Sequence, residues 1–223
     1  GDDKFLSYYV ANFIMKKKPK LTADLKDVIK KLYCEWSVNK WFHVKRVLAF
    51  ATIISKKMKL SKKDIYIIQL AALLHDIGYV KQFRVGGKDR HEKYSCEIAK
   101  KLLKSYKVNE KIVKAILPPI RTHSDFEACN TLHQKILYDA DKLDKTTFGE
   151  IIRKSVICYE KYHMDEHETF KNLYSRLNER KFHLKVSNDI AHKNKKILLP
   201  VYEYYNNFLR QVDKIEGDLD LRV

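Results

Sequence analysis

Apolar side chains recur along this chain every three to four residues, the spacing that gathers them on one face of an α-helix. His43, Val47, Phe50 and Ile54, for example, follow one another at steps of four, three and four. The sequence shows no internal repeat and no pair of strand-like segments. We therefore predict an all-α protein whose helices cover roughly residues 4–17, 22–35, 39–59, 61–78, 91–106, 109–116, 132–162 (interrupted near Gly149), 166–182 and 187–215.

Local signals mark the ends of some of these helices. Ser61 and Asp64 stand three residues apart, the spacing of a capping box with Asp in place of Glu. The helix that they open is nearly all apolar up to Gly78, so we expect it to lie at the centre of the fold. The pair Pro118-Pro119 should break or kink the helix that it follows.

Composition narrows the class of protein. Of the 223 residues, 45% are hydrophobic, which excludes a disordered chain. The 6 Gly and 4 Pro are too few for the turns of a β-sandwich or barrel. The longest uncharged apolar run, Ile65 to Leu74, is about half of the roughly 20 residues that span a bilayer. The 4 Cys form no Cys-x-x-Cys pair and favour a reducing compartment, so we expect a cytoplasmic protein with no membrane partner.

The charge balance suggests what kind of molecule the protein meets. The chain has 45 Lys and Arg against 28 Asp and Glu, a formal net charge of +17. Such a balance favours a polyanionic partner such as a nucleotide, a nucleic acid or a membrane surface. Most of the basic residues are Lys and they are spread along the chain, so solvated helix faces rich in Lys explain the charge equally well.

Histidines and carboxylates interrupt three apolar stretches. His75-Asp76 ends an apolar run, where burying adjacent ionisable groups is costly unless they are paired or bind a cation. Asp141 and Asp144 share one face of a helix that otherwise keeps an apolar period, and His43 interrupts the apolar stripe of its own helix. A divalent metal would satisfy all three helices together, and a buried His and Asp network without metal is the alternative.

These residues resemble the HD-domain metal-dependent phosphohydrolases, whose pattern is a His, a His-Asp pair and a distant Asp on an all-helical scaffold. Two further His segments resemble those of a compact bacterial and archaeal subgroup often associated with nucleotide hydrolysis. The residues that carry the resemblance are His43, the pair His75-Asp76, His91, His123 and Asp141. It implies a single HD-domain helical bundle with its C-terminal helices over residues 27–216, an N-terminal helical extension over 1–26 and a tail over 217–223.

The resemblance also implies roles for these residues. The residues expected to hold the metal are His43, His75, Asp76 and Asp141. Two imidazoles and two carboxylates leave positions open on a six-coordinate ion, and such donors suit one Mn, Fe, Co or Ni ion more than Mg or Zn. For His91 and His123 two roles stay open. We favour contact with phosphate oxygens and protonation of a leaving group over binding of a second metal that Asp76 would bridge.

Three residues are candidates for supporting roles. Lys81 and Arg84 follow the His-Asp segment on a loop, where they could neutralise phosphate charge or form a solvated basic loop. Asp144 lies one helical turn from Asp141 and could orient a ligand or accept a proton.

The chain departs from the family pattern in two places. The subgroup continues after its last Asp with a Gly-Ala pair, whereas this chain has Lys145-Thr146-Thr147-Phe148-Gly149. Some related nucleotidases place a carboxylate base three residues after the His-Asp pair, where this chain has Tyr79. That base must therefore be absent or supplied by another residue.

The function expected from these residues is metal-dependent hydrolysis of a phosphoanhydride or phosphoester bond in a small phosphorylated substrate, a nucleotide first of all. The alternatives are a phosphodiesterase acting on cyclic nucleotides, oligonucleotides or nucleic acid ends, and a non-catalytic regulatory module that binds a nucleotide or RNA. Nucleic acid is the less favoured partner. A homo-oligomer is compatible with the sequence.

Two other groups of residues suggest weaker alternatives. His163 and His167 stand four apart in a polar stretch and are predicted to be surface residues. Tyr202, Tyr204 and Tyr205 with Phe208 could stack on bases, but their helical spacing is more typical of packing or an oligomer contact.

Overall fold

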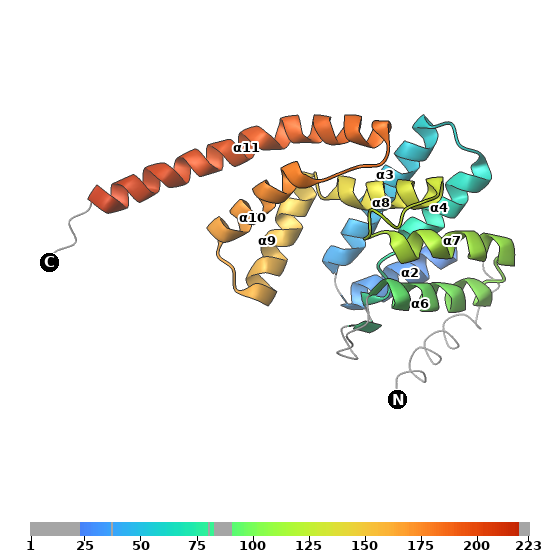
Figure 1. The fold of residues 1–223 in the computed structure, drawn as a ribbon. Coiled ribbons are helices and arrows are strands. Elements are labelled where there is room, and N and C mark those ends of the chain that lie inside the picture. Colours follow the sequence, from blue (N-terminus) through green and yellow to red (C-terminus); the bar gives the residue numbers. More distant parts are fainter. Residues whose placement is uncertain (1–22, 37, 80, 83–90, 219–223) are drawn as a thin grey trace. The chain divides into compact units, whose positions relative to one another are not determined.

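The computed structural model describes residues 23–218 apart from 37, 80 and 83–90, and every regular element in these residues is a helix (Figure 1). The predicted all-α class is therefore confirmed. The helix expected over 4–17 and the candidate residue Arg84 lie outside the described residues. The chain divides into two compact units, Gly1–Asp141 and Lys142–Val223.

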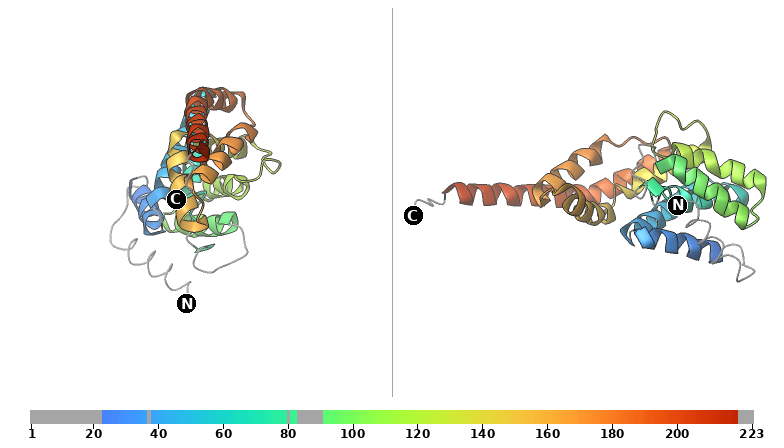
Figure 2. Two further views of the ribbon diagram at one scale, coloured as in Figure 1. Left: turned by 90° about the vertical axis from the view of Figure 1, so that its left-hand side faces the viewer. Right: turned by 90° about the horizontal axis from the view of Figure 1, so that it is seen from below.

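The nearly all-apolar helix lies at the centre of the first unit, as predicted. This helix, α4, is buried from Ile67 to Leu74 except at Gln69, and it packs against α2, α3 and α7. The views agree that α6 and α7 lie side by side (Figures 1 and 2). The helices of this unit are α2 (Ala23–Trp36), α3 (Val38–Lys57), α4 (Lys62–Leu74), α6 (His91–Ser105), α7 (Glu110–Thr122) and α8 (Leu132–Asp144), the last of which ends just inside the second unit.

The two ends of α4 are set by local chemistry. Ser61 Oγ accepts a hydrogen bond from the backbone N–H of Asp64 at 3.1 Å, so the predicted cap is confirmed. The helix ends at Leu74 and a turn over residues 75–78 follows, which is earlier than the predicted end at Gly78.

Gly78 is needed because another helix comes close to its backbone. A Cβ at this position would lie 2.1 Å from the carbonyl oxygen of His91 and 2.4 Å from the backbone nitrogen of Ser95. The Gly78 N–H also donates to Ser95 Oγ at 2.9 Å. This close approach brings the start of α6 against the turn that carries His75 and Asp76.

Helix α7 continues through its two prolines. It extends to Thr122, so the predicted end at Ile116 is wrong. Proline removes a backbone donor and weakens the helix, yet α7 continues beyond both prolines, where Thr122 Oγ1 donates to the carbonyl oxygen of Pro118 at 3.1 Å. His123 is consequently the C-cap residue of this helix.

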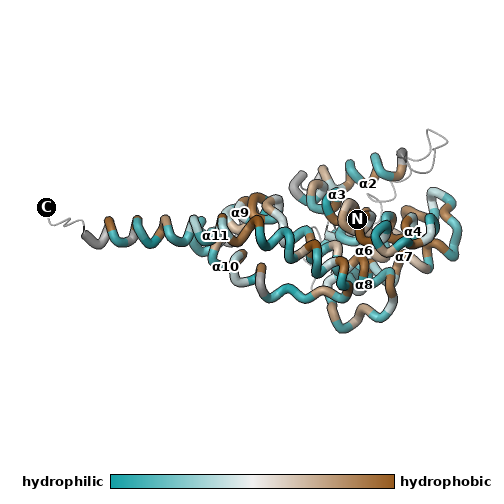
Figure 3. Tube along the Cα trace, turned by 90° about the horizontal axis from the view of Figure 1, so that it is seen from above, coloured by the Kyte–Doolittle hydropathy of each residue, from teal (hydrophilic) through white to brown (hydrophobic). Residues whose placement is uncertain are grey.

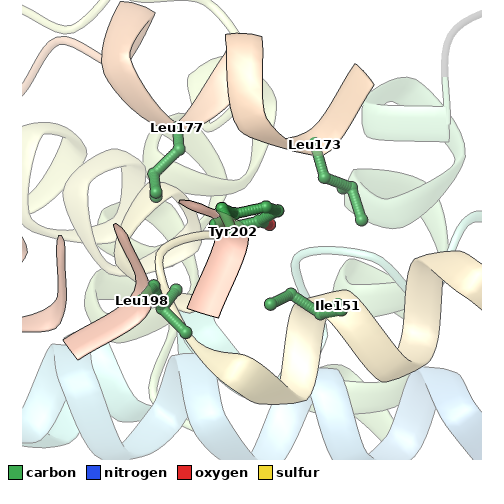
Figure 4. Packing of buried hydrophobic residues seen from close by; sticks show 5 residues of the cluster. All are labelled: Ile151, Leu173, Leu177, Leu198 and Tyr202. Carbon is green, nitrogen blue, oxygen red and sulfur yellow. The ribbon is translucent and has the colours of Figure 1, made fainter. Parts of the chain in front are cut away.

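The second unit is built from α9 (Phe148–Tyr162), α10 (Glu166–Glu179) and the 34-residue helix α11 (Lys185–Asp218). The stretch 132–162 is interrupted between Asp144 and Phe148, close to the predicted place. A core of apolar side chains joins the three helices (Figure 4), and its members are Ile151, Leu173, Leu177, Leu198 and Tyr202.

Residues 163–165 separate α9 from α10. His163 ends α9 in the left-handed conformation with φ of 53°, and Asp165 caps α10 by accepting from the N–H of Glu168 at 2.7 Å. His163 and His167 are both exposed, as predicted. Among the described helices, none combines the length and the apolar character needed to cross a bilayer.

Candidate metal centre

Five segments that are far apart in the sequence bring their histidines and aspartates to one place in the first unit. The contributing elements are α3, the turn after α4, the first residue of α6, the C-cap of α7, and α8. All of these side chains are buried except that of His91, which is 12% exposed. The residues brought together are His43, His75, Asp76, His91, His123 and Asp141.

The carboxylate of Asp76 lies in the middle of this cluster and faces histidines with both of its oxygens. Oδ2 lies 3.5 Å from Nε2 of His43 and 3.6 Å from Nε2 of His75. Oδ1 lies 3.2 Å from Nε2 of His91 and 3.3 Å from Nε2 of His123. One carboxylate therefore separates two pairs of imidazoles.

The first side of the cluster offers donors of the kind that bind transition metals. His43 Nε2 lies 3.4 Å from Oδ1 of Asp141. Single donor atoms of His43, His75 and Asp141 lie within 4.8 Å of one another, and so do those of His75, Asp76 and His123. Mixed imidazole and carboxylate donors at such spacing can hold a divalent ion.

Backbone carbonyls fix the orientation of two of the imidazole rings. The Nδ1 atom of His75 lies 2.8 Å from the carbonyl oxygen of Ala72, and that of His123 lies 2.7 Å from the carbonyl oxygen of Ile120. Because a carbonyl oxygen only accepts, Nδ1 carries the proton in both rings and Nε2 presents a lone pair. Nε2 of His75 is buried and has no hydrogen-bond partner among the described residues, so its lone pair is available to a metal.

Charge and burial keep the central residues in the protonation states that metal binding requires. Burial lowers the pKa of His75 from 6.5 to about 3, so this imidazole stays neutral. Burial acts to raise the pKa of Asp76, but the nearby Lys40 ammonium and the histidines outweigh it and hold that pKa well below its usual value. Asp76 is therefore ionised at neutral pH.

This part of the chain is similar to known proteins. The sequence model of the HD domain matches residues 41–146, which include all six residues of the cluster. These residues form an HD domain. An uncharacterized protein of Clostridium beijerinckii is 29% identical over 133 residues, which cover 60% of this chain and 76% of that protein.

Solved structures resemble the chain over most of its length. A predicted HD superfamily hydrolase from an uncultured Thermotogales bacterium is similar with a TM-score of 0.61 and 21% identity, over 85% of this chain and 92% of that one. Bacillus subtilis YpgQ, solved in complex with ADP, is similar with a TM-score of 0.60 and 18% identity, over 92% and 97% of the two chains. At these identities the likeness shows a common fold.

Lys40 contacts the cluster, although sequence analysis did not single it out. Its Nζ lies 2.7 Å from Oδ2 of Asp76 and 4.0 Å from the centre of the Tyr79 ring. Lys40 stands three residues before His43 in α3, so helical spacing places both on one face and could have suggested it. Tyr79 itself stacks on the His91 ring with centroids 3.9 Å apart.

Glu92 is the second residue that sequence analysis missed. Its Oε2 lies 3.3 Å from Nδ1 of His91, and its Oε1 accepts a short hydrogen bond from Ser124 Oγ. Burial raises the pKa of Glu92, but the Ser124 hydrogen bond and other local interactions outweigh this, so the pKa is lowered. A buried carboxylate therefore lies beside the His91 ring, and its position next to that histidine in the sequence was the available signal.

The supporting residues proposed from the sequence are placed differently. Lys81 Nζ lies 3.2 Å from Oε2 of Glu97 and 4.7 Å from the centre of the Tyr94 ring, so its described contacts are with α6. Asp144 is the last residue of α8 and is fully buried.

Proposed function

We propose that this chain is a metal-dependent phosphohydrolase that cleaves a phosphoanhydride or phosphoester bond of a small phosphorylated substrate. The observation that carries the proposal is the buried Nε2 of His75, which lies beside the donors of His43 and Asp141 and has no hydrogen-bond partner in the part of the chain that the structure describes. A buried imidazole lone pair without a partner is unfavourable, and a divalent cation would satisfy it together with the neighbouring carboxylates.

The proposed metal ligands are His43, His75, Asp76 and Asp141. Their mixed nitrogen and oxygen donors favour one Mn, Fe, Co or Ni ion. A divalent ion held there would lower the pKa of a coordinated water toward neutrality and polarise a phosphoryl oxygen. The carbonyl of Ala72 keeps the His75 ring turned toward the site, which limits the reorganisation that binding requires.

For His91 and His123 we propose contact with the phosphate of the substrate. Their Nε2 atoms lie 3.2 Å apart on the side of Asp76 that faces away from His43. The Glu92 carboxylate lies 3.3 Å from Nδ1 of His91, so a charged group stands behind a ring that could pass a proton to a leaving group. A second metal bound by this pair and bridged by Asp76 is the alternative, and metal stoichiometry distinguishes the two.

A nucleotide is the substrate class that we propose. The formal charge of +17 attracts anionic substrates of any size. The similar protein YpgQ was solved in complex with ADP, which favours a nucleotide over other phosphorylated molecules.

The experiment is a substrate panel with the purified chain and Mn²⁺. Nucleoside tri-, di- and monophosphates are compared with bis-aryl and cyclic phosphodiesters, and products are separated by ion-exchange chromatography. We expect turnover of nucleotides by the wild type, with loss of metal and activity in His75→Ala. The matched control is His167→Ala, an exposed histidine that should leave both unchanged.

Each other outcome contradicts a defined part of the proposal. Turnover confined to diesters would make the chain a phosphodiesterase. No turnover by the metal-loaded protein, together with a nucleotide that raises its melting temperature, would indicate a regulatory binding module. Full metal content in His75→Ala would refute the ligand assignment.

A further inference from the structure

The long helix α11 carries a row of exposed apolar side chains that the core of the second unit does not use. We call this row the outer stripe. Tyr204 is 75% exposed and Ile197 is 70% exposed, although large apolar side chains are usually covered. Apolar positions recur along the helix in the hydropathy colouring (Figure 3). The members of the outer stripe are Ile197, Val201, Tyr204, Phe208, Val212 and Ile215.

The outer stripe is separate from the face that packs in the unit. With about 100° of rotation per residue, its six members fall within about 80° of the helix circumference. Leu198 and Tyr202 are 3% exposed and pack in the core with Ile151, Leu173 and Leu177 of α9 and α10 (Figure 4). That buried face lies about 90° around the helix from the outer stripe. One helix therefore has two apolar faces, and the described residues cover only one of them.

Four members of the outer stripe lie in two pairs that are symmetric about one point of the helix. Ile197 and Val212 lie equally far from the point between Tyr204 and Tyr205, and so do Val201 and Phe208. Two such helices placed antiparallel about a two-fold axis at this point would set Ile197 against Val212 and Val201 against Phe208. A two-fold interface requires this kind of self-complementary surface. From Ile197 to Phe208 the steps of four, three and four also follow the heptad spacing of paired helices.

Charge and area are both compatible with pairing of two copies. The chain is strongly basic, yet between Ile197 and Leu209 the only charged residue is Glu203, so two copies meet here with little like-charge repulsion. The aromatic members, Tyr204 and Phe208, bury up to about 150–250 Å² each. Together they can supply up to about half of the roughly 800 Å² that each partner contributes to a stable interface, and the four aliphatic members add to it.

We propose that the outer stripe is a homodimer interface in which the α11 helices of two copies pack antiparallel. The self-complementary spacing selects a second copy of this chain over an unrelated partner. The inference is independent of the proposed hydrolase activity.

The first test is the mass of the whole chain in solution, measured by sedimentation or light scattering over a wide range of protein concentration. We expect twice the mass of one chain for the wild type. The double variant with Val201→Lys and Phe208→Lys should fall to the mass of one chain. The matched control is Asn207→Lys, which adds the same charge on a polar, exposed face of the same helix and should stay dimeric. Circular dichroism melting checks that each variant is folded.

A second test locates the axis. In Tyr204→Cys, the two new thiols would lie near the two-fold axis, so mild oxidation should give a cross-linked pair of chains. Asn207→Cys under the same conditions should give no more cross-linking than the wild type. A wild type with the mass of one chain at every concentration, or a folded double Lys variant that remains dimeric, overturns the proposal. Cross-linking in Asn207→Cys and not in Tyr204→Cys overturns the antiparallel arrangement.

Discussion

Replacing Gly78 by Ala should lower the stability of the protein and disturb the site. The reason is that α6 contacts the turn after α4 so closely that position 78 has no room for a side chain. The new Cβ would lie 2.1 Å from the carbonyl oxygen of His91, whereas real Cβ contacts are essentially never under 3.0 Å. The turn and α6 must therefore separate by about 0.9 Å, since the nearest atoms belong to the backbone and cannot rotate away. Overpacking of this kind costs about 1–3 kcal/mol. Weakening the hydrogen bond from Gly78 N–H to Ser95 Oγ adds about 1 kcal/mol to this loss of stability.

The expected destabilisation of Gly78→Ala is thus about 2–4 kcal/mol, which lowers the melting temperature by about 5–15 °C. A displacement of His91 by about 1 Å should also lower turnover by up to about a hundredfold. Scanning calorimetry and steady-state kinetics measure the two effects. Gly149→Ala is the matched control, since it lies inside α9, where Ala is favoured over Gly by about 1 kcal/mol. A melting temperature of Gly78→Ala equal to that of the wild type would refute the reasoning.

Two further predictions concern the cluster. The metal-free chain should lose stability as the pH falls from 7 to 5. The pKa of His75 is about 3 in the folded chain and 6.5 in the unfolded chain. Only the unfolded chain therefore takes up this proton over that range, which favours unfolding. Urea unfolding should show that the free energy of unfolding falls by about 1–2 kcal/mol because of this residue. A wild-type free energy of unfolding that stays constant between pH 7 and pH 5 would contradict the prediction. Glu92→Gln keeps the shape beside Nδ1 of His91 but removes the charge, so turnover should fall about 10–100-fold with unchanged metal content. Elemental analysis and a kcat measurement check this, and metal loss would point to a ligand role instead.

The positions of the helices along the chain could largely be predicted from the sequence. Helix positions follow from apolar spacing, and the Ser61 cap follows from a side chain that satisfies a nearby backbone donor. The end of α7 was predicted too early, at Ile116 and not at Thr122. Proline usually ends a helix because it lacks a backbone donor, but that rule leaves out the packing of α7 against α4 and α6.

The clustered residues were visible in the sequence as ionisable groups in apolar surroundings, but their arrangement around the carboxylate of Asp76 was not. The structure places His43 and His75 at one oxygen of Asp76, and His91 and His123 at the other. Such an arrangement depends on the angles at which separate helices meet, which periodicity within one helix does not contain.

Other features were decided by tertiary structure alone. The sequence indicated that Gly78 ends a helix, but the folded chain shows that the close backbone of α6 requires a residue without a Cβ. Tyr202 and Tyr204 stand in the same helical pattern, yet the first is 3% exposed and the second 75%. The sequence by itself determined that α11 is amphipathic, because helical spacing sets which residues share a face. Only the tertiary structure decided which face is covered, because burial depends on the neighbouring helices that the rest of the chain supplies.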